Sequence, residues 1–387
     1  MLKAAVIFEG SPFDRKGLFN AVQNRISHLS ETGRCCIDAY CIHSWDTSFT
    51  RKIRHTPYVP EKKDHVDVDG ISYRMLWYDF SIIDHLTVEK LYRRPLLFRH
   101  FIDRTVPLFQ SYDVMIAHSF TGALIAYEVH EKYGIPYYVT WHGSDIHTHP
   151  VRNRLIRRDT CLVMESAKCN FFVSKALMLK SDELTLKAEK MVLYNGISDR
   201  FERYSDEKRN ELRARYGLSP DDKVVAFVGS LVAVKNVHVL QPLFHAVRAG
   251  YDGNLRFWLV GDGKLRDSVE PVLLADKTID VNFWGNVPAD EMPDVMNCID
   301  VMVLPSLNEG LPLVCAEAVR CGANVVGADV GGIPEVIGRE YVVPHGEGFT
   351  VAMAMKVVDL LEKRPVQHIP DDLDWKRTAE LETDYMS

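Results

Sequence analysis

Short apolar runs alternate with helical patterns along the first half of the chain. The runs that predict strands cover residues 4–8, 38–42, 114–117, 137–141, 171–173 and 191–194. The intervening 3.6-residue periodicity predicts helices at 17–30, 122–132, 154–166 and 176–184. Strands of nearly continuous apolar character, each followed by a helix, indicate a parallel sheet that helices cover on both faces.

The second half repeats this alternation. Its predicted strands cover residues 224–228, 256–260, 281–284, 301–304 and 325–328. A chain of 387 residues exceeds what one hydrophobic core usually serves. We therefore predict an α/β protein with two doubly wound, Rossmann-like domains, and place the crossover between them in the charge-rich segment 198–223.

The segment 305–322 carries the most informative candidate chemistry. It follows an apolar strand, and it places Glu309 and Glu317 on either side of a predicted helix start. Unpaired backbone N–H groups near Gly310 and Leu311 would suit the phosphates of an anionic ligand. The two carboxylates could then accept hydrogen bonds from a nucleotide ribose and from a sugar. Alternatively, one glutamate caps the helix and the other lies on a solvated face.

Glycines and polar residues follow other predicted strands. Gly229 and Ser230 precede Lys235, whose ammonium could neutralise a phosphate. Gly261 opens a Gly-Asp-Gly turn that would let the backbone approach a ligand, and a glycine pair precedes the helical segment 333–335. Tight strand-to-helix connections and helix caps would explain both glycine motifs equally well.

The first half offers His142, which follows a predicted strand and precedes Gly143, and a loop from Phe8 to Gly17. A lone histidine is more often structural than catalytic, but its place at a strand end beside Gly143 leaves both interpretations open. Ligands of doubly wound sheets bind at the carboxyl ends of the strands. We therefore expect these residues to face a cleft shared by the two domains.

Composition excludes several classes of function. The net charge of −7 gives no general attraction for nucleic acid, and 47% hydrophobic with 26% charged residues is typical of a globular protein. The first residues contain no apolar run long enough for a signal peptide or a membrane helix, so we expect a cytoplasmic location.

No metal site is predicted. The eight cysteines form no CxxC pair, and Cys35, Cys36 and Cys41 lie in an apparent strand without further ligands. The carboxylates of Asp67 and Asp69 are better explained by a hairpin turn that continues into a glycine. A dinucleotide oxidoreductase is disfavoured because neither domain has a GxGxxG turn after its first strand.

Together these residues resemble the retaining nucleotide-sugar glycosyltransferases of family 4 (glycosyl transferases group 1), which have the GT-B fold. The resemblance covers nearly the whole chain. It rests on Glu309 and Glu317, Gly229 with Lys235, the Gly261 turn, the motif 331–335, Asn195-Gly196-Ile197 and the run His142-Gly143-Ser144-Asp145. The tail 373–385 looks like the last helix of that family, which crosses back to the first domain. The implied domains are 1–200 with 368–387, on the acceptor side, and 201–367, on the donor side.

The resemblance also implies residue roles. Glu317 would hold the ribose hydroxyls, Glu309 the donor sugar and Lys235 the diphosphate, while His142 would approach the sugar. Gly17 would correspond to a glycine-rich loop near the phosphates. Gly229, Ser230, Gly261, Gly310 and Leu311 would line the donor site. The resemblance further implies that the donor would be a nucleotide-diphosphate sugar. The reaction would be a metal-independent hexosyl transfer without a cofactor, and the product would belong to surface polysaccharide or glycolipid assembly.

Two departures from the family pattern leave a second interpretation open. Ser230 stands where the family usually has an arginine, and the loop before Gly17 has one glycine where many relatives have two. Lys264 or Arg266 could replace the missing cation. The alternative is a catalytically weak or inactive homologue that binds the nucleotide sugar.

The acceptor is indicated only by basic residues interleaved with apolar ones. Arg93, Arg94, Arg99, His100 and Arg104 alternate with Leu96, Leu97, Phe98, Phe101 and Ile102, and Arg152, Arg154, Arg157 and Arg158 form a second cluster. Such faces could rest on an anionic inner membrane surface and reach a lipid-linked saccharide acceptor. An ordinary amphipathic helix that packs on its sheet would show the same pattern.

Overall fold

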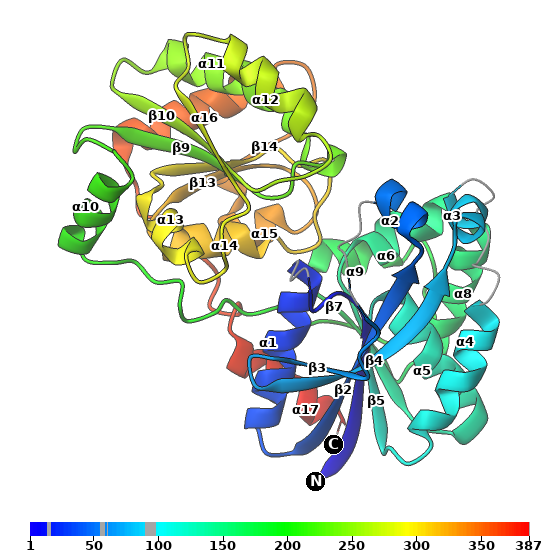
Figure 1. Ribbon diagram of the computed structural model, residues 1–387. Helices are drawn as coiled ribbons and strands as arrows, with labels where there is room; N and C mark the ends of the chain where they lie inside the picture. The colour runs from blue at the N-terminus through cyan, green and yellow to red at the C-terminus, as the bar shows by residue number, and fades with distance from the viewer. Residues whose placement is uncertain (14–16, 55–58, 60, 90–97, 387) are drawn as a thin grey trace. The chain divides into compact units, whose positions relative to one another are not determined.

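The computed structural model describes residues 1–13, 17–54, 59, 61–89 and 98–386. The chain divides into two compact units. One comprises Met1–Gly196 together with Asp374–Ser387, and the other comprises Ile197–Leu373. The predicted ranges were 1–200 with 368–387, and 201–367. Each unit is built on its own sheet (Figure 1).

The first unit contains an eight-stranded sheet in the order β3-β4-β2-β1-β5-β6-β7-β8. Its strands are β1 (Leu2–Glu9), β2 (Cys35–Asp46), β3 (His65–Val68), β4 (Ile71–Phe80), β5 (Val114–His118), β6 (Tyr137–Trp141), β7 (Cys169–Phe172) and β8 (Lys190–Val192). Every pairing except β3 with β4 is parallel. Every residue of β5, β6 and β7 is buried, which explains their unbroken apolar character.

Helices cover both faces of this sheet. They are α1 (Gly17–Glu31), α2 (Ser48–Arg54), α3 (Ile82–Glu89), α4 (Phe98–Thr105), α5 (Ser119–Tyr133), α6 (Ser144–His147), α7 (His149–Arg152), α8 (Arg154–Ser166), α9 (Lys175–Ser181) and α17 (Trp375–Met386), with a 3₁₀ turn η1 (Val106–Phe109). Figure 1 shows α1 and α17 side by side on one face and α4, α5 and α8 on the other. The tail of the chain therefore packs on the first unit.

The hairpin predicted at Asp67–Asp69 is confirmed. β3 and β4 pair antiparallel with Val68 opposite Ile71. Asp69 and Gly70 form the two-residue turn with φ of 46° and 83°, as a type I′ turn requires. The hairpin explains Asp69, so the turn gives no support for a metal-binding carboxylate pair.

The second unit has a six-stranded, fully parallel sheet in the order β11-β10-β9-β12-β13-β14. Its strands are β9 (Lys223–Val228), β10 (Leu255–Val260), β11 (Val281–Gly285), β12 (Val301–Leu304), β13 (Asn324–Ala328) and β14 (Val342–Val343). Its helices are α10 (Asp206–Arg215), α11 (Leu240–Gly250), α12 (Arg266–Ala275), α13 (Met292–Cys298), α14 (Leu313–Arg320), α15 (Ile333–Ile337) and α16 (Phe349–Lys363), with 3₁₀ turns η2 (Ala233–Lys235), η3 (Val237–Val239) and η4 (Arg339–Tyr341). The strand order reverses between β9 and β12, which makes that point the expected ligand site. The predicted fold class, two doubly wound α/β domains, is confirmed.

The charged segment 198–223 is not a free linker, because part of it forms α10 within the second unit. Arg213 is 4% exposed, and its guanidinium donates to the carbonyl of Cys298 at 2.6 Å and to Asp300 at 3.2 Å. Arg209 reaches the same carboxylate at 3.1 Å. Charges in the segment where we placed the crossover thus pair with groups inside the second unit.

Candidate functional site

Glu309 is held at the point where the strand order of the second unit reverses. It follows β12, and its Oε1 accepts a hydrogen bond from Ser306 Oγ at 2.6 Å. Lys235, which follows β9, places its Nζ 2.7 Å from the same oxygen. Their side chains are only 18% and 12% exposed. This ion pair therefore joins the loops after β9 and β12, the two strands that flank the expected ligand site.

Backbone contacts fix the same loops. The Leu307 amide donates to the carbonyl of Val234 at 2.8 Å, and His345 Nε2 lies 2.9 Å from the Ser306 carbonyl oxygen. Gly331 approaches so closely that an added Cβ would lie 1.9 Å from the Glu309 carbonyl oxygen, and its φ is 52°. Only glycine fits there. The motif 331–335 thus supports the backbone of Glu309, besides starting α15.

The glycine turns after β9 and β10 also contact each other. A Cβ on Gly261, where φ is 126°, would lie 2.1 Å from the carbonyl oxygen of Gly229. The Leu231 amide donates to the Asp262 carbonyl at 3.0 Å. Gly229 has φ of 153°, and a Cβ there would approach the Cε of Lys235 at 3.9 Å. The structure thus brings Gly229, Gly261 and Lys235 together.

Glu317 lies in α14, and its side chain is half-buried. Burial raises the pKa of its carboxyl to about 7. It has no hydrogen-bond or ion-pair partner among the described residues. Burial raises the pKa of the Cys315 thiol, the charges of Glu309 and Glu317 raise it further, and the charge of Lys235 opposes them. Both glutamates and the lysine therefore belong to one neighbourhood.

Gly310 and Leu311 do not lie at the start of the helix, where the sequence predicted them. Helix α14 begins at Leu313 with Pro312 as its N-cap, so both residues lie in the loop before the helix. Pro312 has φ of −80° and ψ of 85°, which is not helical, so the first helical residue is the next one. Both residues remain half-buried beside Glu309 in the chain.

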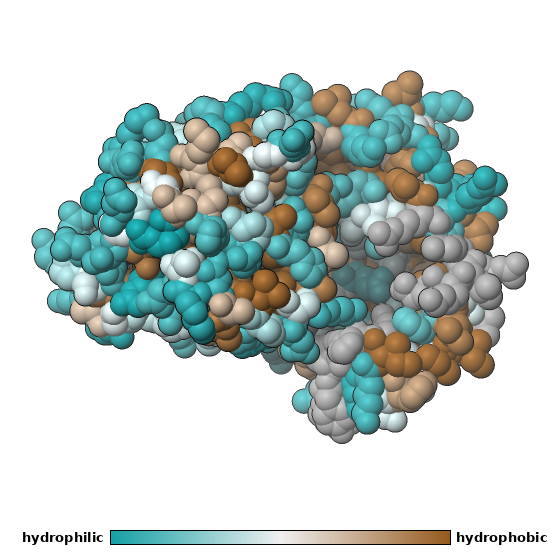
Figure 2. All heavy atoms as spheres, turned by 90° about the horizontal axis from the view of Figure 1, so that it is seen from above, coloured by the Kyte–Doolittle hydropathy of each residue, from teal (hydrophilic) through white to brown (hydrophobic). Residues whose placement is uncertain are grey.

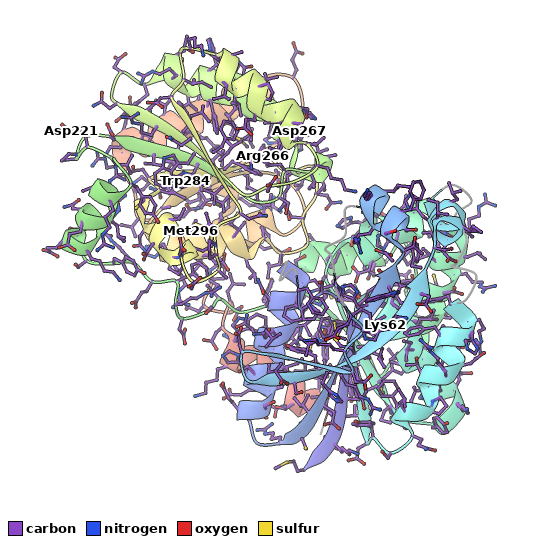
Figure 3. The ribbon with its side chains drawn as sticks, viewed as in Figure 1. Lys62, Asp221, Arg266, Asp267, Trp284 and Met296 are labelled. Carbon is purple, nitrogen blue, oxygen red and sulfur yellow. The ribbon has the colours of Figure 1, made fainter. Side chains whose placement is uncertain are left out.

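No cation replaces the missing arginine directly after Gly229. Ser230 is exposed and carries a neutral hydroxyl. Arg266, labelled on α12 in Figure 3, is bound to Glu270 at 2.7 Å and to Asp262 at 3.2 Å. Lys264 is exposed, and the described part of the chain offers it no ion-pair partner. Of the two residues predicted to replace the arginine, only Lys264 has a charge without an ion-pair partner among the described residues.

In the first unit, His142 follows β6 at a strained turn. Gly143 has φ of 146°, and its amide donates to the buried carboxylate of Asp145 at 2.9 Å. The ring nitrogens His142 Nε2 and His118 Nδ1 are 3.1 Å apart. Burial, and secondarily the charge of Arg25, lower the pKa of His142 to about 3. Burial also lowers the pKa of His118, so both rings are neutral. One ring therefore donates its N–H to the bare nitrogen of the other.

No sequence motif pointed to His118, although it is the polar last residue of a buried strand and lies at the same kind of strand end as His142. Gly17 is the exposed first residue of α1, and a Cβ there would meet no atom within 4 Å. The preceding residues 14–16 lie outside the described part of the chain.

The described residues contain no group of three or more histidine, cysteine or acidic side chains arranged to hold a metal ion. None of the described helices combines the length and apolar character that crossing a bilayer demands. The basic segment near residue 100 is described only from Phe98 onward, and Arg93, Arg94, Leu96 and Leu97 lie outside. In the described part of this segment Arg99 binds Glu128 at 2.7 Å, and Arg104 donates to the carbonyl of Trp77.

The second basic cluster is partly engaged as well. Arg158 binds Asp159 at 2.9 Å and Arg157 donates to the Glu183 carbonyl, whereas Arg154 is exposed. Hydrophobic residues lie between hydrophilic ones over the face seen in Figure 2. The engaged arginines and the buried Phe98, Phe101 and Ile102 favour a helix that packs on its sheet.

Comparison with known proteins finds relatives of the segment that contains Lys235, Glu309 and Glu317. Residues 222–363 match the family model for glycosyl transferases group 1. TuaC of Bacillus subtilis, named for a glycosyltransferase of teichuronic acid biosynthesis, is 30% identical over 212 residues, which are 54% of this chain and 51% of that protein. The N-acetyl-alpha-D-glucosaminyl L-malate synthase of Bacillus anthracis is 29% identical over 272 residues, 65% of this chain and 66% of that protein. The chain thus spans about half to two thirds of these relatives.

Solved structures extend the likeness to the whole fold. HepE from Anabaena, in complex with UDP and glucose, has a TM-score of 0.69 at 17% identity and covers 100% of this chain and 96% of its own. Sucrose-phosphate synthase from Thermosynechococcus elongatus has a TM-score of 0.69 at 16% identity, covering 98% and 92%. The chain has the GT-B fold, and its residues 222–363 match the glycosyl transferases group 1 in sequence.

Proposed function

We propose that the protein is a retaining, family-4-like hexosyltransferase that moves a sugar from a nucleotide-diphosphate sugar to a hydroxyl group. The observation that carries this proposal is the meeting of Lys235, Glu309 and Glu317 beside the Gly229 and Gly261 turns. They meet where a doubly wound sheet binds its ligand. The match of the same segment to group 1 glycosyl transferases supports it.

The residue roles follow from charge and hydrogen-bonding capacity. The Glu317 carboxylate has no other partner among the described residues and can accept hydrogen bonds from both ribose hydroxyls. Lys235 donates one of its three N–H groups to Glu309, which leaves two for the diphosphate. Glu309, fixed by Ser306 and Lys235, presents its second carboxylate oxygen to the sugar. His142 takes part as a neutral hydrogen-bond donor or acceptor toward the sugar.

In the proposed reaction the bond from the anomeric carbon to the diphosphate oxygen breaks, and the acceptor oxygen forms a new bond on the same face. The acceptor proton passes to the departing phosphate oxygen. Negative charge grows on the diphosphate in the transition state, so Lys235 and the loop amides stabilise that state more than the bound donor. No metal ion or cofactor is needed, and transfer should persist in EDTA.

The acceptor we propose is a saccharide or lipid-linked saccharide in surface polysaccharide or glycolipid assembly, which fits the name of the Bacillus subtilis relative. The expected location is cytoplasmic, at the inner membrane face where the acceptor is lipid-linked. The second candidate function, nucleotide-sugar binding without turnover, is favoured by Ser230 because a neutral hydroxyl gives the diphosphate less charge stabilisation than an arginine.

Thermal-shift measurements with UDP-, GDP- and ADP-glucose test donor binding, because a ligand that binds only the folded state raises the melting temperature. UDP-glucose comes first, since it is the ligand in a HepE structure. We expect one donor to stabilise the wild type and Glu317→Ala to lose that shift. The control Glu211→Ala, at an exposed position of α10, should keep it. Donor stabilisation that survives Glu317→Ala would contradict the assigned ribose contact.

Turnover separates the two candidate functions. An enzyme should release free sugar from the cognate donor or transfer it to an added acceptor, and both activities can be measured in the presence of EDTA. A protein that binds the donor and releases no sugar over many hours would instead be the inactive homologue.

A further inference from the structure

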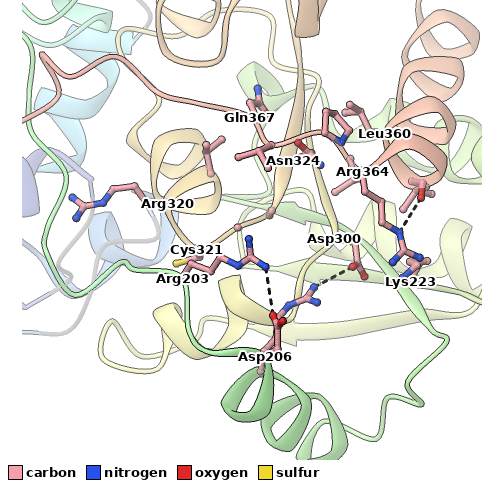
Figure 4. A pocket seen from close by; sticks show the side chains of 18 residues that line it. Arg203, Asp206, Lys223, Asp300, Arg320, Cys321, Asn324, Leu360, Arg364 and Gln367 are labelled. Carbon is pink, nitrogen blue, oxygen red and sulfur yellow. Dashed lines mark hydrogen bonds and ion pairs between the residues drawn. The ribbon is translucent and has the colours of Figure 1, made fainter.

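A pocket of about 360 Å³ lies where strands of the second unit's sheet begin, at the end opposite the donor loops (Figure 4). Its lining includes the first residues of three neighbouring strands, Lys223 of β9, Val301 of β12 and Asn324 of β13. The donor loops follow the other ends of these strands. The pocket is therefore a separate feature of the same unit.

Positive charge dominates the pocket. Five cationic side chains line it, against the two carboxylates of Asp206 and Asp300; the cations are Arg203, Arg209, Lys223, Arg320 and Arg364. The protein as a whole has a net charge of −7, so this concentration of cations runs against the overall balance. A surplus of this kind favours an anion.

The two acids do not neutralise the surplus. Asp300 already accepts hydrogen bonds from the Val224 amide at 2.8 Å and from Arg209 at 3.1 Å, and it also binds Arg213, which lies behind the pocket lining, at 3.2 Å. Asp206 contacts Arg203 at 3.4 Å, in a pair whose side chains are 78% and 60% exposed. Such an exposed pair is weak.

Lys223 is the most informative member of the lining. It is only 8% exposed, and its ammonium has no hydrogen-bond or ion-pair partner in the described part of the chain. Lysines are almost never buried to this extent without one. Burial, together with Arg364, Arg213 and Arg209, lowers its pKa in spite of Asp300. Figure 4 shows its side chain beside that of Arg364. An anion between these two cations would supply the missing partner.

Part of the remaining wall is apolar, beside the polar side chains of Asn324 and Gln367. The larger apolar side chains in the lining are Val301, Val319, Leu360, Leu361, Pro365 and Val366. The volume falls in the range of pockets that hold small organic ligands, about 300–1,000 Å³. A bare phosphate ion would leave these walls uncovered, whereas a phosphate ester would cover them.

We propose that this pocket binds a small organic phosphate monoester, with the phosphate held by Lys223 and Arg364 and the organic body against the apolar walls. The site is distinct from the donor site and does not depend on the proposed transfer reaction. Because the donor site also takes phosphates, the test must tell the two apart.

Isothermal titration of the full chain with glucose 6-phosphate at low salt tests the proposal, with inorganic phosphate and glucose as companion probes. We expect glucose 6-phosphate to bind more tightly than inorganic phosphate, and glucose to give no heat. Lys223→Met and Arg364→Asn should each weaken binding about tenfold or more, as loss of a charged hydrogen-bond donor does. Asparagine tolerates the left-handed backbone of Arg364, whose φ is 48°.

Two control variants locate the binding. Lys277→Met removes an exposed lysine outside the pocket, and Lys235→Met removes the cation of the donor site. Both should leave glucose 6-phosphate affinity within twofold. Thermal unfolding checks that each variant is folded, and the two pocket variants serve as independent tests. Loss of binding in Lys235→Met but not in either pocket variant would overturn the proposal, as would absence of binding by the wild type.

Discussion

At the scale of single residues, Glu317 determines how donor binding should depend on pH. Its pKa of about 7 in the free protein leaves it mostly protonated at pH 6 and mostly ionised at pH 8. In the proposed donor site the ribose hydroxyls donate to the ionised form, so donor affinity should be about tenfold weaker at pH 6 than at pH 8. Titration calorimetry at the two pH values measures this, and proton release near pH 7 should accompany binding.

The matched control is Glu317→Gln, which keeps the shape of the side chain and removes its titration. Its affinity should vary little between pH 6 and 8. Affinity that rises as the pH falls would show that the neutral acid, and not the carboxylate, makes the contact.

The same shift affects stability. In an unfolded chain a glutamate has a pKa of about 4.3, so between pH 4.3 and 7 the folded state binds more protons at Glu317 than the unfolded state. The stability that the protonated carboxyl contributes is therefore complete below about pH 4.3 and is lost as the pH rises through about 7. Because the side chain keeps some access to solvent, we expect Glu317→Gln to be more stable at pH 8 by on the order of 1–2 kcal/mol in urea unfolding, and equal at pH 4.

Ser230 is the second residue whose chemistry can be tested directly. It follows Gly229 with an exposed hydroxyl where a cation would meet the donor diphosphate. Ser230→Arg should tighten binding of the cognate nucleotide sugar about tenfold, because a hydrogen bond to a charged partner contributes roughly 1.5–3 kcal/mol. The control Ser268→Arg adds the same charge on α12. Equal gains in both variants would indicate a general effect of charge and not a phosphate contact after Gly229.

At the scale of elements, the fit between loops is as important as the side chains they carry. Gly331 allows the loop after β13 to lie against the carbonyl of Glu309, where a Cβ would approach to 1.9 Å. Gly331→Ala should displace Glu309, destabilise the protein by about 1–3 kcal/mol and weaken donor binding.

Gly348→Ala separates the clash from backbone strain. Gly348 also has a positive φ, 75°, but a Cβ there would meet nothing within 4 Å. The Gly348→Ala variant should lose about 1 kcal/mol of stability and keep its donor affinity. If Gly331→Ala bound the donor as tightly as Gly348→Ala, the glycine pair would have no role in positioning Glu309.

The elements show what the sequence could predict. Strand 301–304 and helix 154–166 match the structure residue for residue, because long apolar runs and a well-placed cap such as Asn153 are local signals. β14 has two residues, too few for any periodicity. Lys235 and Glu309 were predictable as strand-end residues, whereas the contact between His118 and His142 depends on the pairing of β5 with β6. His345 has no local signal, since it reaches Ser306 from beyond β14.

At the scale of the whole molecule, a buried ion pair joins the first helix of the chain to the last. Arg25 of α1 and Glu382 of α17 are 1% and 0% exposed, and Arg25 Nε lies 2.5 Å from Glu382 Oε2. The other two guanidinium nitrogens and the second carboxylate oxygen have no partner within the described residues. The tail therefore fixes a positive charge inside the first unit, and that charge helps lower the pKa of His142.

Removing one member of this pair should be far more damaging than removing both. Glu382→Gln leaves the Arg25 charge uncompensated, and we expect a loss of about 3–5 kcal/mol in denaturant unfolding. Arg25→Met combined with Glu382→Leu should recover most of that loss, because apolar side chains replace a pair whose desolvation offsets its attraction. In the double variant the pKa of His142, followed by NMR, should rise from about 3 toward the ordinary value, since one of its two causes is gone. A double variant as unstable as Glu382→Gln would show that the attachment of α17 depends on the ion pair itself and not on the apolar packing around it.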